Sequence, residues 1–571
     1  MTATTTAAAE TSPGRAALTH RQTLLALSGL LMGMVVTMLS STVVSASLPV
    51  IIADLGGSQS AYTWVVTSTL LAMTVSTPVW GKLADIANRK VLIQTALILF
   101  TVGSMLAGLS DSTTFLIACR ALQGLGAGGV MALVQVILSD ILSPRERGRY
   151  MGLLGAVTMI PTVIGPLLGG AITDSIGWEW NFYVGVPFAV VAIVLLQRTL
   201  PVLVHDTKRS LDYVGTVVIA GAVSLLLIWV SLGGQEFEWG SAASYAMVIG
   251  AAVLGALSIV VERKAKNPLI PPRLFGNRTL VLAVIASAAI GVALFGTGVF
   301  LTQYLQLAQG KSPTVAGLFT IPMAIGSLLS SLIVGRLITS TGIWKRYVVG
   351  GTIVCAAGFF GLGTIGYGTS LALVCVYMFL VGVGMGPVMQ NMVLVVQNTT
   401  PIQDMGAASS TVGFFRSLAG TLGVAGLGSV LAHKVTELIN DGLANAGLPA
   451  TGSGGDAIPD MSTLPEPMLS IVETAYGEAI GQTFMVIAPI LLIAVIATSL
   501  LPNTPLGTKS GLEQRQVPVD AAQDVERPAV PAIAADGSAD ERPLPLGAHA
   551  GVRNALARTV DPAAKVGALT P

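Results

Sequence analysis

The sequence predicts an all-helical, polytopic membrane protein with about fourteen spanning helices, and three observations support this fold class. First, 53% of the 571 residues are hydrophobic and 10% are charged, against about a quarter charged in a soluble domain. Second, the apolar residues form long unbroken runs, such as 24–48 and 91–109, and about 20 helical residues cross a bilayer. Third, these runs lack the short alternating pattern of membrane β-strands, which favours helices that satisfy their own backbone groups.

The predicted spans follow one another along the chain, separated by short stretches with Gly, Pro or charged residues. The first seven lie at 24–48, 62–81, 91–109, 114–140, 150–172, 182–200 and 213–232. The other seven lie at 243–261, 280–306, 315–338, 347–366, 371–396, 406–432 and 480–501. We expect no cleaved signal peptide, because the stretch before the first span has no apolar segment and the first run is longer than a signal sequence requires.

Lys and Arg are distributed unequally between the two sides that this count defines. The N-terminal segment and the loops after spans two, four, six, eight and ten, counted with the adjoining span ends at Arg198 and Arg336, carry nineteen of them, whereas the opposite loops carry only Lys311 and Lys434. Because basic loops face the cytoplasm, we expect both termini to be cytoplasmic and the protein to lie in the inner or plasma membrane. The formal net charge of +1 gives no reason to expect a nucleic acid partner.

An internal repeat divides the chain into related halves. The fourth span carries glycines at alternate positions 124, 126 and 128, and the twelfth carries them at 382, 384 and 386. Transporters are commonly built from such halves, so we expect spans seven and eight to be inserted between two six-helix bundles. The predicted domains are an N-terminal tail 1–22, a bundle 23–200, the inserted pair with its loops 201–278, a second bundle 279–502 with an external loop 433–479, and a disordered tail 503–571.

The loop 81–90 between the second and third spans begins at Gly81 and contains an acid and two bases. Asp85 can pair with Arg89 or Lys90, or face the N-terminus of a neighbouring helix. Contacts of this kind favour one of two packings by about 1 kcal/mol. The segment therefore predicts a conformational latch, and the alternative is that its bases only fix the topology.

Arg120 lies inside the fourth span, where a guanidinium costs about 2.5 kcal/mol or more unless it faces water or a partner. The glycines that follow it allow close helix contact. We therefore expect Arg120 to face the central cavity, with Gln123 or backbone carbonyls as partners. The alternative is that Arg120 lies close enough to the helix end to extend to the interface.

The fifth span combines prolines with several glycines. Pro166 and an earlier proline free backbone carbonyls and kink the helix, while Gly165, Gly169 and Gly170 allow tight packing. We expect a helix that bends or seals the transport pathway. The alternative is a stripe of glycines that serves packing alone.

Most polar side chains within the spans are expected to hold helices together, and a few could line a substrate pathway. Arg416 lies well inside the thirteenth span, which makes it difficult to explain as an end residue. The pathway candidates are Ser40, Gln135, Gln303, Gln390, Asn391 and Arg416.

The sequence contains no signature of an enzyme or of an ATP-driven pump. It has no P-loop and no nucleophile motif, and Cys119, Cys355 and Cys375 lie in apolar segments without the spacing of a metal site. We expect no enzymatic activity, no cofactor and no bound metal.

These segments resemble the major facilitator superfamily and, within it, the fourteen-helix drug:proton antiporters, over about residues 20–502. The loop that ends at Lys90 is similar to the motif G-x-L-A-D-x-x-G-R-K, with Asn88 in place of its second glycine. The segment 120–129 resembles the motif R-x-x-Q-G-x-G-A, whose arginine the family implicates in proton coupling. The segment 152–170 resembles the antiporter motif of exporters, with Pro161 replacing a glycine.

The resemblance implies the major facilitator fold and proton-driven efflux of small amphipathic drugs or secondary metabolites by alternating access. Such multidrug antiporters confer antibiotic resistance. The implied partners are a small-molecule substrate, protons as the coupling ion and the lipid bilayer, and a monomer is favoured. Two other functions stay open, namely a lipid exporter and a membrane sensor or scaffold that has lost transport.

The first span departs from the family pattern at the position that matters most for charge. The segment 39–49 resembles L-D-x-T-I-V-N-V-A-L-P, with Ser40 in place of the aspartate that the family associates with protonation and cationic drugs. The segment 178–187 resembles W-R-W-x-F-x-x-N-V-P, with Glu179 and Gly185 departing. We expect a weaker preference for dications than in relatives that keep the aspartate. The sequence does not assign the residue that carries the coupling proton. The candidate acids are Asp54, Asp85 and Asp140, which lie near span ends.

Overall fold

The computed structural model describes residues 20–56, 59–200, 211–233, 237–311, 313–447 and 468–507. All of these residues belong to one compact unit. Most of the two predicted tails lies outside the described residues. The described part is almost entirely helical, and its one β pairing is an isolated bridge between Gly233 and Phe237.

Six helical segments form the first bundle, and each coincides with a predicted span. The sixth consists of two helices, because the chain breaks at Gly185 and Pro187 lies in the first turn of the next helix. The segments are α1 (His20–Asp54), α2 (Gln59–Ile86), α3 (Arg89–Ala107), α4 (Thr113–Ile141), α5 (Pro144–Ile176), and α6 (Trp180–Tyr183) with α7 (Val186–Thr199).

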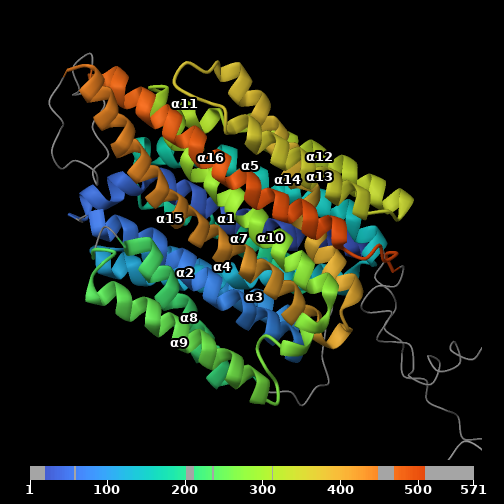
Figure 1. Ribbon diagram of the computed structural model, residues 1–571. Coiled ribbons are helices and arrows are strands. Elements are labelled where there is room, and N and C mark those ends of the chain that lie inside the picture. Colours follow the sequence, from blue (N-terminus) through green and yellow to red (C-terminus); the bar gives the residue numbers. More distant parts are fainter. Residues whose placement is uncertain are drawn as a thin grey trace, which may run out of the picture. The chain divides into compact units, whose positions relative to one another are not determined.

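The inserted pair consists of α8 (Tyr213–Leu232) and α9 (Ala242–Lys264), which lie side by side at the periphery (Figure 1). The turn η1 (Pro272–Gly276) connects the pair to the second bundle. That bundle contains α10 (Arg278–Gly296) with the π-helical turns η2 (Thr297–Leu301) and η3 (Tyr304–Ala308), α11 (Pro313–Leu318) with α12 (Ile321–Thr341), α13 (Lys345–Leu362), α14 (Leu371–Thr399), the turn η4 (Ile402–Asp404), α15 (Met405–Asn445) and α16 (Met468–Leu500).

The described helices thus form fourteen segments at the fourteen predicted spans. Eleven of the helices found among the described residues are long and apolar enough to cross a membrane. The prediction of an all-helical, polytopic membrane protein is confirmed. One boundary differs: α15 extends to Asn445 and α16 begins at Met468, so helix continues into both sides of the predicted loop 433–479. Residues 448–467 of that loop lie outside the described part.

Capping residues explain where several helices begin. The side chain of Ser112 accepts the N–H of Phe115 at the start of α4, and the side chain of Asn277 accepts the N–H of Thr279 at the start of α10. At α5, Ser143 and Glu146 form a reciprocal capping box. Each of these side chains satisfies a backbone donor that has no partner within its helix.

The alternate glycines of the repeat have the same structural role in both bundles. In α4, Gly124 and Gly128 contact the backbone of α2, and Gly126 contacts the backbone of α3. In the equivalent helix α14, Gly382 contacts the backbone of α12 and Gly384 that of α13. An added Cβ at any of these positions would overlap a neighbouring backbone. The central helix of each bundle therefore packs closely on both of its neighbours because these positions lack side chains.

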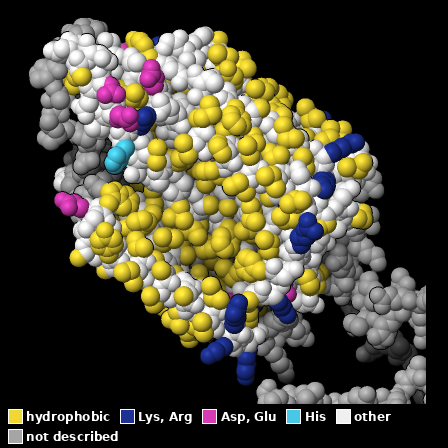
Figure 2. Space-filling view, viewed as in Figure 1, with side chains coloured by type: hydrophobic (Ala, Val, Ile, Leu, Met, Phe, Trp, Pro, Cys, Tyr) yellow, Lys and Arg dark blue, Asp and Glu magenta, His cyan; other side chains and the backbone are white. Residues whose placement is uncertain are grey.

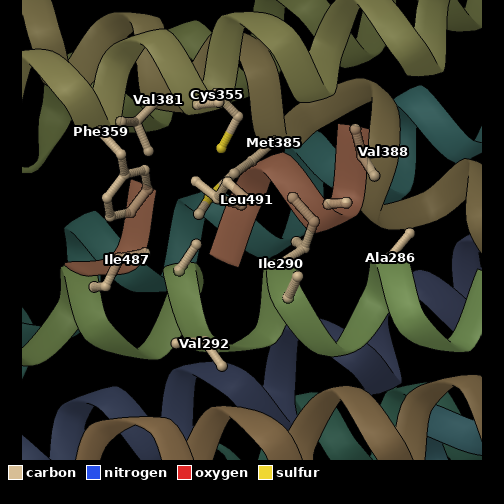
Figure 3. Packing of buried hydrophobic residues seen from close by; sticks show 14 of the residues in the cluster. Ala286, Ile290, Val292, Cys355, Phe359, Val381, Met385, Val388, Ile487 and Leu491 are labelled. Carbon is tan, nitrogen blue, oxygen red and sulfur yellow. The ribbon is translucent and has the colours of Figure 1, made fainter. Parts of the chain in front are cut away.

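Each bundle has a hydrophobic core of its own. In the second bundle, Ile290 of α10, Phe359 of α13, Met385 of α14 and Ile487 of α16 point toward one another between the helices (Figure 3). A separate cluster fills the first bundle and includes Leu133 of α4. A smaller apolar cluster joins the bundles, because Phe414 of α15 lies in it and Val75 of α2 packs against it.

Charged side chains collect at the ends of the helices, and a broad apolar surface lies between them. Figure 2 shows dark blue Lys and Arg side chains gathered at one end and most of the magenta acidic side chains at the other. We call the first the basic end; it is the end at which α2, α4 and α9 finish and α3 and α5 begin.

Candidate functional site

Asp85 connects the two bundles at the basic end. From the last turn of α2, its Oδ1 accepts the N–H of Gly406 at 2.8 Å and its Oδ2 accepts the N–H of Ala407 at 2.9 Å. These donors lie in the first turn of α15, where N–H groups have no partner within the helix and the helix dipole favours a negative charge. Asp85 is only 2% exposed, so water competes little for these bonds. We call Asp85, Gly406 and Ala407 the clasp.

Arg89 supports the clasp from within the first bundle. One Nη of Arg89 lies 3.7 Å from Oδ1 of Asp85, and the other donates to Asp140 of α4. Its Nε donates to the carbonyl of Ala84 at 2.7 Å. Arg89 is fully buried, and a buried guanidinium needs such partners to offset its loss of hydration. The Arg89 side chain therefore holds α2, α3 and α4 in one arrangement behind Asp85.

Lys90 and Asn88 act locally rather than between the bundles. Asn88, which replaces a glycine of the loop motif, caps α3 by accepting the N–H of Lys90 at 3.0 Å. Nζ of Lys90 donates to the carbonyl of Gln197 in α7 at 2.6 Å. Of the four predicted latch residues, Gly81, Asp85 and Arg89 are part of the clasp and its support, whereas Lys90 joins α3 to α7.

Gly81 allows the helices of the clasp to approach one another. A Cβ at Gly81 would overlap the side chain of Ser410 and lie 2.8 Å from the carbonyl oxygen of Gly406. A Cβ at Gly406 would overlap the carbonyl of Gly81 and lie 2.6 Å from Oδ1 of Asp85. Only glycine at both positions lets the carboxylate reach the start of α15.

A second set of polar contacts joins the bundles, starting at the same end of the protein and extending inward to Gln135 and Gln390. Arg147 of α5 is 1% exposed and donates to Oε1 of Gln397 in α14. Nε2 of Gln397 in turn donates to the carbonyl of Gln135 at 3.2 Å. The side chain of Gln135 donates to Gln390 at 2.9 Å. Of the predicted pathway residues, Gln135 and Gln390 are therefore in direct contact across the two bundles.

In the sequence, Arg147 is recognisable only as one charge of a basic loop. It lies between Arg145 and Arg149, and nothing in the pattern distinguishes it from them. Its role depends on a contact with a residue 250 positions away along the chain. Only the fold brings Arg147 and Gln397 together.

Arg120 and Gln123 are partners, as the sequence suggested. Nη1 of Arg120 donates to Oε1 of Gln123 at 2.9 Å, and Nε2 of Gln123 donates to Oγ of Ser104 in α3 at 2.6 Å. Arg120 is 5% exposed. The guanidinium is thus enclosed between helices of the first bundle rather than extended to the surface.

The predicted antiporter motif packs α5 against α1. A Cβ at Gly165 would overlap Thr42, and one at Gly169 would overlap the carbonyl of Val43, whereas Gly170 faces open space. The side chain of Thr42 donates to the carbonyl of Pro161 at 2.9 Å. The Pro166 side chain lies outside the described residues. The glycines therefore bring the backbones together, and polar side chains of α1 bond to carbonyls of the proline-containing helix.

Ser40 lies against the break between α6 and α7. It is 1% exposed and makes no hydrogen bond through its Oγ with the described residues. A Cβ at Gly185 would lie 3.9 Å from Cβ of Ser40. Ser40 stands where the first-span motif has an aspartate, and Gly185 stands where the motif of 178–187 has an asparagine. These two positions are therefore neighbours in space.

Arg416 is a cation near the middle of the described helices. It lies eleven residues after the start of α15, about 16 Å along the helix and so about half of a 30 Å hydrocarbon layer. Its one hydrogen bond within the described residues is a long one of 3.4 Å to the carbonyl of Met389. Oδ1 of Asn391 and Oε1 of Gln303 are also buried without a partner there. Polar groups left unsatisfied in this way can bind a polar substrate or water.

Nothing in the described part of the chain forms a metal centre. Its His, Cys, Asp and Glu residues include no group of three or more that could hold an ion.

Comparisons with known proteins agree with this architecture. The family model for the Major Facilitator Superfamily matches residues 30–424. A Mycobacterium tuberculosis protein described as an uncharacterized MFS-type transporter is 35% identical over 479 residues, covering 84% of this chain and 69% of the relative. The multidrug transporter protein MdtP of Bacillus subtilis is 35% identical over 425 residues, covering 74% of this chain and 78% of the relative.

A solved structure shares the fold at low sequence identity. The proton:xylose symporter XylE, of the same superfamily, superimposes with a TM-score of 0.56 at 15% identity, covering 87% of this chain and 99% of the symporter.

Proposed function

The chain belongs to the Major Facilitator Superfamily, and from this premise we propose that it exports small amphipathic molecules by alternating access, driven by protons. The superfamily consists of transporters, so the chain is a multi-pass membrane transporter for small molecules and not an enzyme. The direction of transport, the coupling ion and the class of substrate are our proposal. The similarity to a multidrug transporter supports export.

The observation on which the proposal depends is the clasp between α2 and α15. At the basic end the two bundles meet through a carboxylate, two backbone N–H groups and two facing glycines. Contacts of this type break and reform without disturbing either core, which suits a protein that alternates between two packings. A rigid scaffold or sensor has no need of a polar, glycine-lined contact at this place.

The proposed orientation follows from the basic end. Basic side chains at helix ends favour the cytoplasm, so the clasp would close the pathway on the cytoplasmic side. Breaking the clasp would allow substrate to enter from the cytoplasm or the inner leaflet, as export requires.

Two residues indicate which substrate charge the pathway favours. Arg416 places a positive charge near the middle of the membrane with only a long bond to a carbonyl. Ser40 leaves the first helix without the acid that the family motif has there. A cationic substrate would meet repulsion in a low-dielectric environment without a compensating carboxylate. We therefore propose anionic and neutral amphipathic molecules as the preferred substrates, ahead of cations and dications.

Arg120 supports proton coupling because its guanidinium is buried inside the first bundle. Its bond to Gln123 and the bond from Gln123 to Ser104 form a buried polar chain across α3 and α4. An ionisable residue enclosed within a membrane span marks a substrate or ion pathway in transporters. The carboxylates Asp85 and Asp140 belong to a separate network around Arg89, at the other end of α4 and about 30 Å of helix from Arg120.

The experiment uses a host that lacks its own efflux pumps. Accumulation of matched anionic, neutral and cationic fluorescent compounds is measured with and without a protonophore. We expect expression of the chain to lower accumulation of anionic and neutral compounds, and a protonophore to abolish the difference. Arg416→Gln should reduce export of anions more than export of neutral compounds. Preferential export of cations would contradict the proposed substrate class, and altered membrane lipids without drug export would favour a lipid exporter.

A further inference from the structure

A pocket of about 380 Å³ lies at the basic end, where α9 finishes and the chain turns toward α10. Four cationic side chains and one carboxylate contribute to its lining. The residues that line it are Lys82, Glu262, Arg263, Ala265, Lys266, Asn267, Pro268, Pro271, Pro272 and Arg273. The pocket therefore combines a positive charge with walls built from both the first bundle and the segment that follows the inserted pair.

The one carboxylate of the pocket is engaged by the backbone. Glu262 is 5% exposed, and its two oxygens accept the N–H groups of Leu269 at 3.2 Å and Ile270 at 3.0 Å. These bonds fix the turn that forms one wall. Three prolines in the same turn restrict its backbone further, so the pocket is formed before any ligand binds and costs little ordering on binding.

Two of the four cations remain available to a ligand. Arg273 donates to both oxygens of Asp404 at 2.8 Å, and Lys82 is buried at 3% exposure. Arg263 and Lys266 are exposed and make no hydrogen bond or ion pair with the described residues. An anion in the pocket would gain contacts to these two side chains without displacing a partner.

The location of the pocket relative to the membrane indicates the source of the anion. α9 has 23 residues, about 34 Å of helix, which matches a hydrocarbon layer of about 30 Å. Its outer face exposes Tyr245, Ile249 and Val253. Only 11% of its most apolar stretch is buried inside the protein. Its last turn therefore lies at the level of the lipid headgroups, and Figure 2 shows basic side chains bordering an apolar surface there.

We propose that this pocket binds the phosphate-bearing headgroup of an anionic phospholipid, with Arg263 and Lys266 contacting the phosphate and the acyl chains lying along α9. Phosphate is a strong acceptor that pairs well with Arg and Lys. Basic pockets beside transmembrane helices on the cytoplasmic side suit anionic headgroups. This binding site is separate from the pathway around Arg416 and does not depend on the transported substrate.

The test measures lipid binding to the purified full chain in detergent by native mass spectrometry. Phosphatidylglycerol is titrated against phosphatidylcholine, and inorganic phosphate is added as a competitor. The test variant is the double substitution Arg263→Gln and Lys266→Gln. The matched control is Lys345→Gln and Arg346→Gln, two basic residues at the start of α13 that do not line the pocket. All four positions lie at least partly at the surface, so the substitutions leave the fold intact.

We expect tighter binding of phosphatidylglycerol than of phosphatidylcholine, and about a tenfold or greater loss of that binding in the pocket variant, since the variant removes both cations that are available to the phosphate. The conservative exchange Arg263→Lys with Lys266→Arg should retain it, and the control should bind as the unaltered chain does. Equal binding of the two lipids, or an equal loss in the control, would overturn the proposal. Competition by inorganic phosphate without any lipid preference would show a soluble-anion site and would also overturn it.

Discussion

Asp85→Asn should open the basic end of the protein. Asn keeps one acceptor oxygen, so one of the two N–H groups of Gly406 and Ala407 loses its partner. A hydrogen bond to a charged group contributes about 1.5–3 kcal/mol, and a charge at a helix N-terminus about 0.3–1 kcal/mol. The clasped arrangement should therefore lose about 2–4 kcal/mol, which shifts the equilibrium between the two arrangements roughly 30-fold or more. Arg89 still has Asp140 as a partner, so the fold should survive.

The assay measures the distance between two spin labels by pulsed electron paramagnetic resonance. Labels at Val91→Cys and Ile343→Cys report on the basic ends of the two bundles, since both residues are exposed. Cys375→Ser removes the one native cysteine that is not buried. Asp212→Asn is the matched control, because Asp212 caps α8 by the same chemistry within the inserted pair. The reasoning is refuted if Asp85→Asn gives the same distance distribution as the unaltered chain, or if Asp212→Asn shifts it equally.

Two further predictions concern Gly81, beside the clasp, and Arg120, inside the first bundle. Gly81→Ala should shift the same label distances in the same direction, because its Cβ would overlap Ser410, whereas Gly350→Ala, which meets open space, should not. Arg120→Leu should lower the thermal stability by about 1–3 kcal/mol, because Gln123 loses a buried donor. Adding Gln123→Leu should recover part of that loss, and strictly additive effects of the two substitutions would show that they do not interact.

The helices could be predicted because a membrane span is recognised from a continuous local stretch of sequence. Unbroken apolar runs and the alternation of basic loops depend on neighbouring residues only. The close packing of α4 also followed from the glycines after Arg120. The length of α15 could not be predicted in the same way, because its polar continuation to Asn445 lacks the hydropathy of a span.

The clasp could be predicted only in part. The pattern around Asp85 suggested a helix N-terminus as partner, but it could not select α15, which lies more than 300 residues away. Arg147 was missed because a buried cation and a loop cation look alike in sequence, and its contact with Gln397 exists only in the folded chain. Likewise, the proximity of Ser40 to Gly185 is visible only in three dimensions.

The most direct test of proton-driven export uses the purified chain in liposomes that contain a pH-sensitive dye. The anionic compound that cells export most strongly is supplied as a concentration gradient, with no imposed pH difference. The account predicts that downhill movement of the compound drives protons in the opposite direction, and that Arg120→Leu weakens this proton flux more than it weakens binding of the compound. Movement of the compound without any proton flux would contradict the account.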